Sequence, residues 1–175
     1  VKAASADCAY YSNGQRIYPN CKHSYGADWV CTGCGMTIPC TVEVSGTVTP
    51  YLNFEDAVNA ACAAGTATLK LYADVPNDFY YFTSGAVTLD LNGKTVNGQI
   101  GVYGATLTVT DTAEQKGTMV NDVDRVIDYA SGKLIILDTT DSCGAVDGHE
   151  PWTIVSWANT ATIGTTGKED IVLPA

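Results

Sequence analysis

The sequence predicts a mainly β protein: a short parallel β-helix, or solenoid, with a helical N-terminal cap, preceded by a small cysteine-rich segment. Two observations lead to this prediction. First, a glycine followed by a short alternating strand recurs at Gly65, Gly85, Gly104 and Gly132, at spacings of 20, 19 and 28 residues. Second, five of the seven cysteines fall within the first 40 residues. A fixed period of about 20 residues that carries one strand per unit is typical of a β-solenoid.

Each repeat unit carries large aliphatic residues at every second position, which predicts strands with one buried face. Leu89 is expected to lie in a buried stack with Leu71 and Leu107. Thr88 and Asp90 occupy the alternate positions and are expected to face water. Further short strands fill the connections, so each turn of the solenoid would hold two or three strands. A β-sandwich is the alternative, because it also has short strands separated by turns.

The segment before the repeats predicts a hairpin and one helix. Residues 41–49 alternate on both sides of Ser45-Gly46, as in two strands joined by a tight turn. Asn53 is a suitable N-cap for a helix near residues 53–64, which has apolar residues at helical spacing and Gly65 as its stop. We expect this helix to cover the open end of the solenoid, because an exposed strand edge promotes aggregation.

Composition restricts the range of partners. Nine basic residues stand against nineteen acidic ones in 175 residues, a net charge of −10. Nucleic acids and anionic lipid surfaces both require clustered Lys and Arg, so neither is an expected partner. The sequence has no run of 18 apolar residues, which argues against membrane insertion. An acidic β protein rich in Thr, Gly and Tyr is compatible with a secreted or cell-surface location.

The first 40 residues contain a pattern of metal ligands instead of hydrophobic periodicity. Cys21 and His23 form a Cys-x-His pair, and seven residues later Cys31 and Cys34 begin a Cys-x-x-Cys-Gly turn that ends at Gly35. Such a turn places two thiolates on one side of a tight knuckle. Three thiolates and one imidazole satisfy a tetrahedral zinc site, and a site without an open position is structural and not catalytic.

Other roles for these cysteines remain open at this stage. Disulfides are one alternative, although an odd number of cysteines argues against a pure disulfide framework. A redox dithiol is another, although no βαβ pattern surrounds the Cys-x-x-Cys pair. Cys8 and Cys40 flank the cluster, and they either pair with each other or supply a ligand in place of His23.

The chain resembles cysteine-rich zinc-knuckle plus right-handed β-helix modules of secreted or surface proteins from Gram-positive, clostridia-like bacteria. The Cys-x-His and Cys-x-x-Cys-Gly motifs, the segment 51–58 and the segment 87–96 carry this resemblance, which covers residues 21–140. It implies a zinc-binding segment at residues 1–40 and a right-handed β-helix at residues 41–175. It further implies a non-catalytic extracellular module, structural or binding a glycan or a host or cell-surface protein. We expect a monomeric module of a larger protein.

The alternative function is that of a small β-helix carbohydrate-active enzyme, a polysaccharide lyase or hydrolase. Such an enzyme needs paired carboxylates, and the closest approach to a pair is the cluster of Asp122, Asp124, Arg125 and Asp128. A solvated loop with a surface ion pair explains that cluster better than a catalytic site does, so the non-catalytic prediction is preferred. Ligand binding would instead use aromatic side chains that can stack on sugars. The candidates are Tyr80, Tyr81 and Tyr103.

Overall fold

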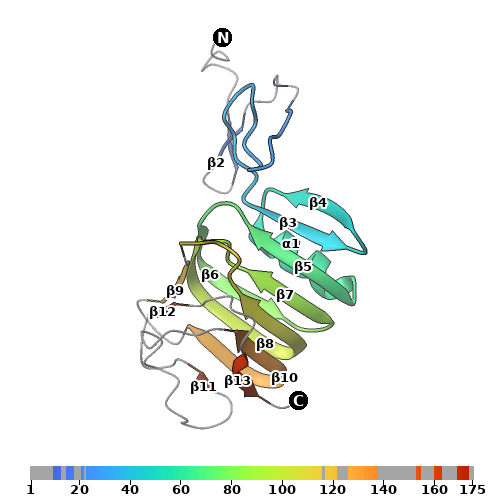
Figure 1. Ribbon diagram of the computed structural model, residues 1–175, viewed down its shortest axis with the longest axis vertical. Helices are drawn as coiled ribbons and strands as arrows, with labels where there is room; N and C mark the ends of the chain where they lie inside the picture. The colour runs from blue at the N-terminus through green and yellow to red at the C-terminus, as the bar shows by residue number, and fades with distance from the viewer. Residues whose placement is uncertain are drawn as a thin grey trace.

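The computed structural model shows a mainly β fold with a helix packed near its N-terminal end (Figure 1). It describes residues 10–12, 15–17, 21, 23–115, 117–121, 126–137, 153–154, 160–162 and 169–173. The elements are β1 (Tyr10–Ser12), β2 (Gln15–Ile17), β3 (Cys40–Val44), β4 (Thr47–Tyr51), α1 (Phe54–Ala63), β5 (Thr66–Leu71), β6 (Val75–Phe82), β7 (Ala86–Asp90), β8 (Thr95–Thr110), β9 (Thr118–Val120), β10 (Ile127–Leu137), β11 (Thr153–Ile154), β12 (Thr160–Thr162) and β13 (Glu169–Leu173).

The large sheet is parallel in its centre and antiparallel at its ends. Strands β5, β7, β8 and β10 pair in parallel in that order, and β6 pairs in parallel with the first half of β8. The hairpin of β3 and β4 adds to β5 antiparallel, while β11 and β13 add antiparallel to β10. The sheet is therefore mixed and does not close on itself. The predicted mainly β fold is confirmed, with parallel pairing between the successive repeats.

The four repeat glycines share one structural role. Gly65, Gly85, Gly104 and Gly132 all have positive φ angles, between 77° and 109°. Backbone hydrogen bonds run from one repeat to the next at this place: Ala86 N–H donates to the Gly65 carbonyl at 2.7 Å, and Thr106 N–H donates to the Gly85 carbonyl at 2.8 Å. A Cβ at Gly132 would come within 2.1 Å of a backbone oxygen. Gly65 and Gly85 precede β5 and β7, whereas Gly104 and Gly132 lie within β8 and β10, and at each of them the backbone takes a conformation that favours glycine.

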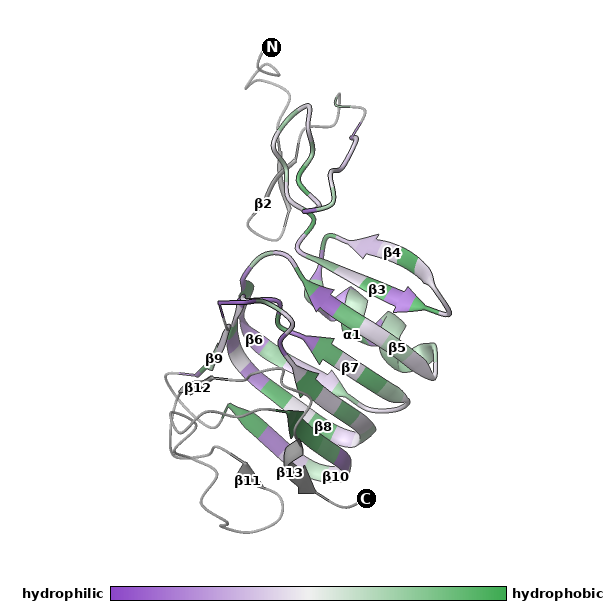
Figure 2. Ribbon diagram, in the orientation of Figure 1, coloured by the Kyte–Doolittle hydropathy of each residue, from purple (hydrophilic) through white to green (hydrophobic). Residues whose placement is uncertain are grey.

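Buried aliphatic residues line up across the parallel strands. Leu69, Leu89, Val109 and Ile136 are in register on β5, β7, β8 and β10, and each is at most 1% exposed. Leu89 is buried as predicted, but its predicted stack is wrong: it lies beside Leu69 and Val109, not Leu71 and Leu107. Figure 2 shows hydrophobic residues recurring along β5, β7 and β8. This column forms the centre of the core.

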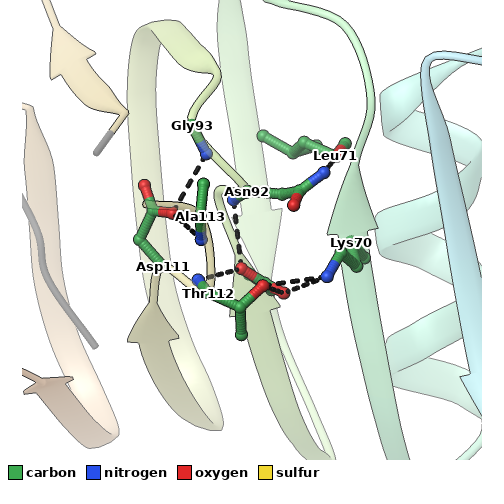
Figure 3. A network of polar contacts seen from close by, with 8 residues as sticks. Lys70, Leu71, Asn92, Gly93, Asp111, Thr112 and Ala113 are labelled. Carbon is green, nitrogen blue, oxygen red and sulfur yellow. Dashed lines mark hydrogen bonds and ion pairs between the residues drawn. The ribbon is translucent and has the colours of Figure 1, made fainter. Parts of the chain in front are cut away.

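Asp90 does not face water as the alternation predicts. Its side chain is buried, and its Oδ1 accepts hydrogen bonds from the N–H groups of Asn92 and Thr112 at 3.0 and 2.9 Å. Its Oδ2 accepts from the Thr112 hydroxyl at 2.6 Å and lies 3.0 Å from Lys70 Nζ. Figure 3 shows this network, in which Lys70 comes from the preceding repeat and Thr112 from the following one. The prediction failed because Asp90 sits where the strand turns, and the corner of the next repeat covers it.

The hairpin and the helix form as predicted. Ser45 and Gly46 both have positive φ in the turn between β3 and β4, as a tight hairpin turn requires. Asn53 caps α1, and its Oδ1 accepts the Glu55 N–H at 2.8 Å. The buried face of α1 belongs to the same core cluster as residues of β3, β5 and β6. With ten residues, this helix is too short to cross a membrane, and the described residues contain no longer one.

Candidate metal centre

A compact turn brings two of the predicted ligands together. Gly35 N–H donates to the Cys31 carbonyl at 2.8 Å, and Cys31 N–H donates to the Met36 carbonyl at 2.8 Å. Gly35 has a φ of 75°, which closes the turn immediately after Cys34. The isolated bridge between Tyr25 and Cys31 holds the chain that carries the other two ligands against this turn. The local hydrogen bonds thus fix the knuckle that the Cys-x-x-Cys-Gly spacing predicts.

The four predicted ligands converge on one point. The ligand atoms of Cys21, His23, Cys31 and Cys34 all lie within 4.8 Å of one another. The Cys21 and Cys31 sulfurs are 3.6 Å apart, and Cys34 Sγ is 3.5 Å from His23 Nδ1. A tetrahedral zinc with ordinary bond lengths requires an S···S edge of about 3.8 Å and an S···N edge of about 3.5 Å. This donor set therefore fits a tetrahedral ion of zinc's size.

Gly33 is a part of this centre that the sequence analysis did not single out. A Cβ at position 33 would lie 3.2 Å from Cys21 Sγ and 3.8 Å from Cys31 Sγ. A side chain at position 33, directly before Cys34, would crowd the Cys21 sulfur, which favours glycine there. The signal was present in the sequence, because glycine within a short Cys-x-x-Cys turn marks a close approach to the backbone.

The neighbouring thiols affect one another's pKa values. Burial, together with the neighbouring Cys31 and Cys34, raises the pKa of Cys21 to about 12. For Cys31, burial acts in the same direction, but hydrogen bonds from the backbone of Cys34, Gly33 and Ser24 and from His23 lower its pKa to about 5. The Cys31 thiolate is thus stabilised, whereas the ionisation of Cys21 beside it is disfavoured. A divalent ion at the centre would reverse this opposition.

A small core of its own surrounds the cluster. Cys31, Met36 and Ile38 are buried, and Tyr25 and Trp29 pack against them half-buried. The rings of Tyr25 and Trp29 lie 6.1 Å apart, and Trp29 in turn lies 6.1 Å from Tyr72, just beyond β5. The Pro39 carbonyl accepts the N–H groups of Tyr72 and Ala73 at 2.8 and 3.2 Å. These contacts attach the cysteine-rich segment to the first repeat.

Cys40 and Cys62 are not part of the cluster. Both carry free thiols and are buried in the core of the β body. The Cys40 thiol donates weakly to the carbonyls of Tyr51 and Asn53, at 3.8 and 3.9 Å. Cys40 therefore does not replace His23, nor is it paired in a disulfide. Cys8 lies outside the described residues.

The three tyrosines predicted to bind a ligand divide between two environments. Tyr80 is 5% exposed, and its ring packs edge-on against Phe54 at 4.7 Å. Tyr81 and Tyr103 are 49% and 38% exposed, and their rings meet edge-on at 5.6 Å. The structure brings only the last two together on one surface, because consecutive residues of β6 point to opposite sides of the sheet.

The acidic cluster of the alternative enzyme function falls mainly outside the described residues, where Asp122, Asp124 and Arg125 lie. Asp128 is described, and its Oδ2 accepts a hydrogen bond from the Tyr103 hydroxyl at 2.5 Å. This carboxylate therefore borders the exposed tyrosine pair.

Comparison of the chain with protein-family models, with curated proteins and with solved structures found no match.

Proposed function

We propose that this chain is a non-catalytic module whose cysteine-rich segment is held together by structural zinc. One observation carries the proposal: three thiols and one imidazole place their ligand atoms within 4.8 Å of one another. Four protein ligands leave no position for a substrate, so such an ion stabilises the fold. The small core of Cys31, Met36 and Ile38 is too limited to order this segment without help.

Removal of one ligand tests this proposal. Structural zinc contributes about 10–16 kcal/mol of apparent binding free energy in small modules, so Cys34→Ser should abolish zinc binding and unfold the segment up to residue 40. The β body should stay folded. Native mass spectrometry gives the zinc content, and hydrogen exchange shows which segment unfolds. Cys62→Ala is the matched control, because it removes a thiol outside the cluster and should leave one zinc per chain. A zinc-free native chain with Cys31 or Cys34 in a disulfide would contradict the proposal.

The finer architecture belongs to the same proposal. In this proposal, the stack of parallel strands is a short right-handed β-helix with α1 as its N-terminal cap. The protein is located outside the cell, secreted or on the cell surface. The glycine corners and the in-register aliphatic column support the β-helix. The zinc-knuckle motif followed by β-helix-like segments supports a module of a secreted or surface protein.

A second part of the function is the binding of a glycan or a protein on the face that carries Tyr81 and Tyr103. The exposed ring pair is the observation that favours it, since aromatic faces bind apolar sugar surfaces and polar rims provide hydrogen bonds. Gly101 lies beneath the pair, because a Cβ there would touch both rings, at 2.5 and 2.7 Å. Asp128 is the adjacent polar group.

Glycan arrays and assays on wall polysaccharides test this second part. Tyr81→Ala should weaken ligand binding by about tenfold, in line with the loss of one aromatic contact. Val48→Ala is the control, since Val48 is a similarly exposed apolar residue on β4. Equal binding by wild type and Tyr81→Ala would contradict the proposed surface. Release of cleaved sugar would contradict the non-catalytic proposal and favour the enzyme.

A further inference from the structure

A pocket of about 510 Å³ lies apart from the zinc cluster and from the exposed tyrosine pair. Its walls come from Pro39 and Cys40 at the start of β3, from residues 52–55 at the start of α1, and from the first half of β6. Pockets of a few hundred Å³ are the size that holds small organic molecules or a long side chain of a partner.

The charged groups of the pocket all have one sign. Glu55, Asp74 and Asp78 line it, and none of the other described residues that line it is Lys, Arg or His. Asp74 accepts the Thr95 N–H at 2.8 Å, and Asp78 accepts the Phe79 N–H at 2.8 Å, each through its Oδ1. These bonds position the two carboxylates while leaving their second oxygens available. Within the part of the chain that the structure describes, the one ion pair is Lys70 with Asp90, so none of the described basic side chains is paired with a carboxylate of the pocket.

Two of these acidic residues also act on Tyr80, which lines the same pocket. Burial is the main cause that raises the pKa of Tyr80 to about 12, and the negative charges of Asp78 and Glu55 add to it. Between the carboxylates the wall is apolar, with Val75 buried and Leu52 40% exposed. A ligand must therefore combine positive charge with an apolar stem.

A bare metal ion does not match this arrangement. Among the described residues, the only group of metal-ligating side chains whose ligand atoms converge is the Cys/His cluster. Glu55, Asp74 and Asp78 do not converge in this way, so they do not form the oxygen cage that a metal ion requires. An anionic ligand is opposed by the charge. An extended organic cation satisfies both the dispersed carboxylates and the apolar wall.

We propose that this pocket binds an organic cation, an ammonium or guanidinium head on an aliphatic stem, with the head among Glu55, Asp74 and Asp78 and the stem against Leu52 and Val75. Two sources share this chemistry: a free alkylamine, and a Lys or Arg side chain presented by a partner protein. The pocket uses none of the zinc ligands and neither exposed tyrosine. If the pocket does not bind an organic cation, the proposed zinc site and the proposed tyrosine surface are unaffected.

The test is a titration of the zinc-loaded chain, followed by NMR of the residues that line the pocket. The free probe is 1-aminopentane, with 1-pentanol as its neutral isostere. The peptide probe is a short peptide with one central Lys, with norleucine as its neutral counterpart. We expect saturable binding of the cationic probes, at least about tenfold tighter than that of the neutral ones, and weaker binding at high salt. Tighter binding of the peptide than of the amine would identify a protein partner, and the reverse would identify a free amine.

Two charge-matched double variants separate the pocket from the overall charge of the chain. Asp74→Asn with Asp78→Asn retains the Oδ1 acceptors but removes two charges, and should weaken cation binding by about tenfold. Glu43→Gln with Glu114→Gln removes two exposed charges that do not line the pocket, and should change binding less than twofold. Equal losses in both variants, equal binding of pentanol and aminopentane, or no saturable binding of either cationic probe would each overturn the proposal.

Discussion

Two buried aspartates show how single side chains connect neighbouring repeats. Asp90 bonds to Lys70 of the preceding repeat and to Thr112 of the following one. Asp111 is fully buried, and its Oδ1 accepts the N–H groups of Gly93 and Ala113, at 3.0 and 2.9 Å (Figure 3). These carboxylates accept backbone N–H groups at the corners, where the strand ladder provides no acceptor.

Asp111→Asn should lower the free energy of unfolding by about 2–3 kcal/mol. Asp111 accepts hydrogen bonds through both oxygens, and the second accepts the Gly117 N–H at 2.5 Å. The amide NH₂ of an asparagine would face one of these backbone N–H groups, so a buried donor would be left without an acceptor. Urea denaturation measures the change. Glu114→Gln is the matched control in the same loop, and should stay within about 0.5 kcal/mol. Equal midpoints for the two variants would contradict this role of Asp111.

At the scale of the element, the parallel register decides which side chains support one another. Leu89 sits between Leu69 and Val109 in the buried column, whereas Thr88 is paired with Thr68 and Thr108 on the other side of the strands. The core column therefore depends on each aliphatic side chain, while the threonine row is partly open to water.

Leu89→Ala should cost about 2–5 kcal/mol, because it opens a cavity in the centre of this column. Thr88→Ala should cost about 0.5 kcal/mol or less, because the half-buried position loses little packing. Thermal unfolding of the two variants measures the difference. If both substitutions shifted the melting temperature equally, the assigned faces of β7 would be wrong.

Elements with strong local signals could be predicted from the sequence, and those set by distant contacts could not. Ser45-Gly46, Asn53 and the four repeat glycines encode a turn, a cap and the corners through local backbone chemistry. The register of Leu89 was missed because residues two apart on a strand share one face. Alternation therefore cannot distinguish Leu69 from Leu71 as a partner. The antiparallel addition of β13 to β10 joins residues far apart in the sequence, and no local pattern indicates it.

The four converging residues of the candidate metal centre could also be predicted from local signals. A Cys-x-x-Cys turn and a Cys-x-His pair fix their ligands through short-range geometry, so spacing alone named all four. The packing of Trp29 and Met36 around them was missed, because an irregular segment has no periodicity that would identify a buried face.

At the scale of the whole molecule, two separate cores meet at a narrow junction. The small core surrounds the Cys/His cluster, and the large core runs through α1 and the strands. Among the described residues, this junction is formed by the hydrogen bonds to the Pro39 carbonyl and by the ring contact between Trp29 and Tyr72. Removal of an ion held by the Cys/His cluster should therefore unfold the small core without the large one, which is also the result expected for Cys34→Ser.

The large core also sets how the molecule responds to alkaline pH. Burial raises the pKa of Cys40 from its ordinary value of 9.0 to about 12, with a smaller contribution from Asp56. The folded chain keeps this proton above pH 9, whereas the unfolded chain loses it. The contribution of Cys40 to the free energy of unfolding is therefore fully present below about pH 9 and is lost as the pH rises towards 12. Tyr80 acts in the same direction, because burial raises its pKa from 10.0 to about 12.

Cys40→Ala should make the alkaline loss of stability shallower, by about 1 kcal/mol per pH unit between roughly pH 10 and 11.5. The variant will be less stable at neutral pH, because it removes a buried side chain, so the slope against pH is the informative quantity. Val42→Ala is the matched control: it truncates a buried neighbour on β3 that has no proton to lose, and it should keep the slope of the wild type. Urea denaturation of the three proteins, prepared with the same metal content, at a series of pH values gives all three slopes, and any metal contribution cancels in their differences. Equal slopes for Cys40→Ala and the wild type would show that Cys40 is not a source of the alkaline lability.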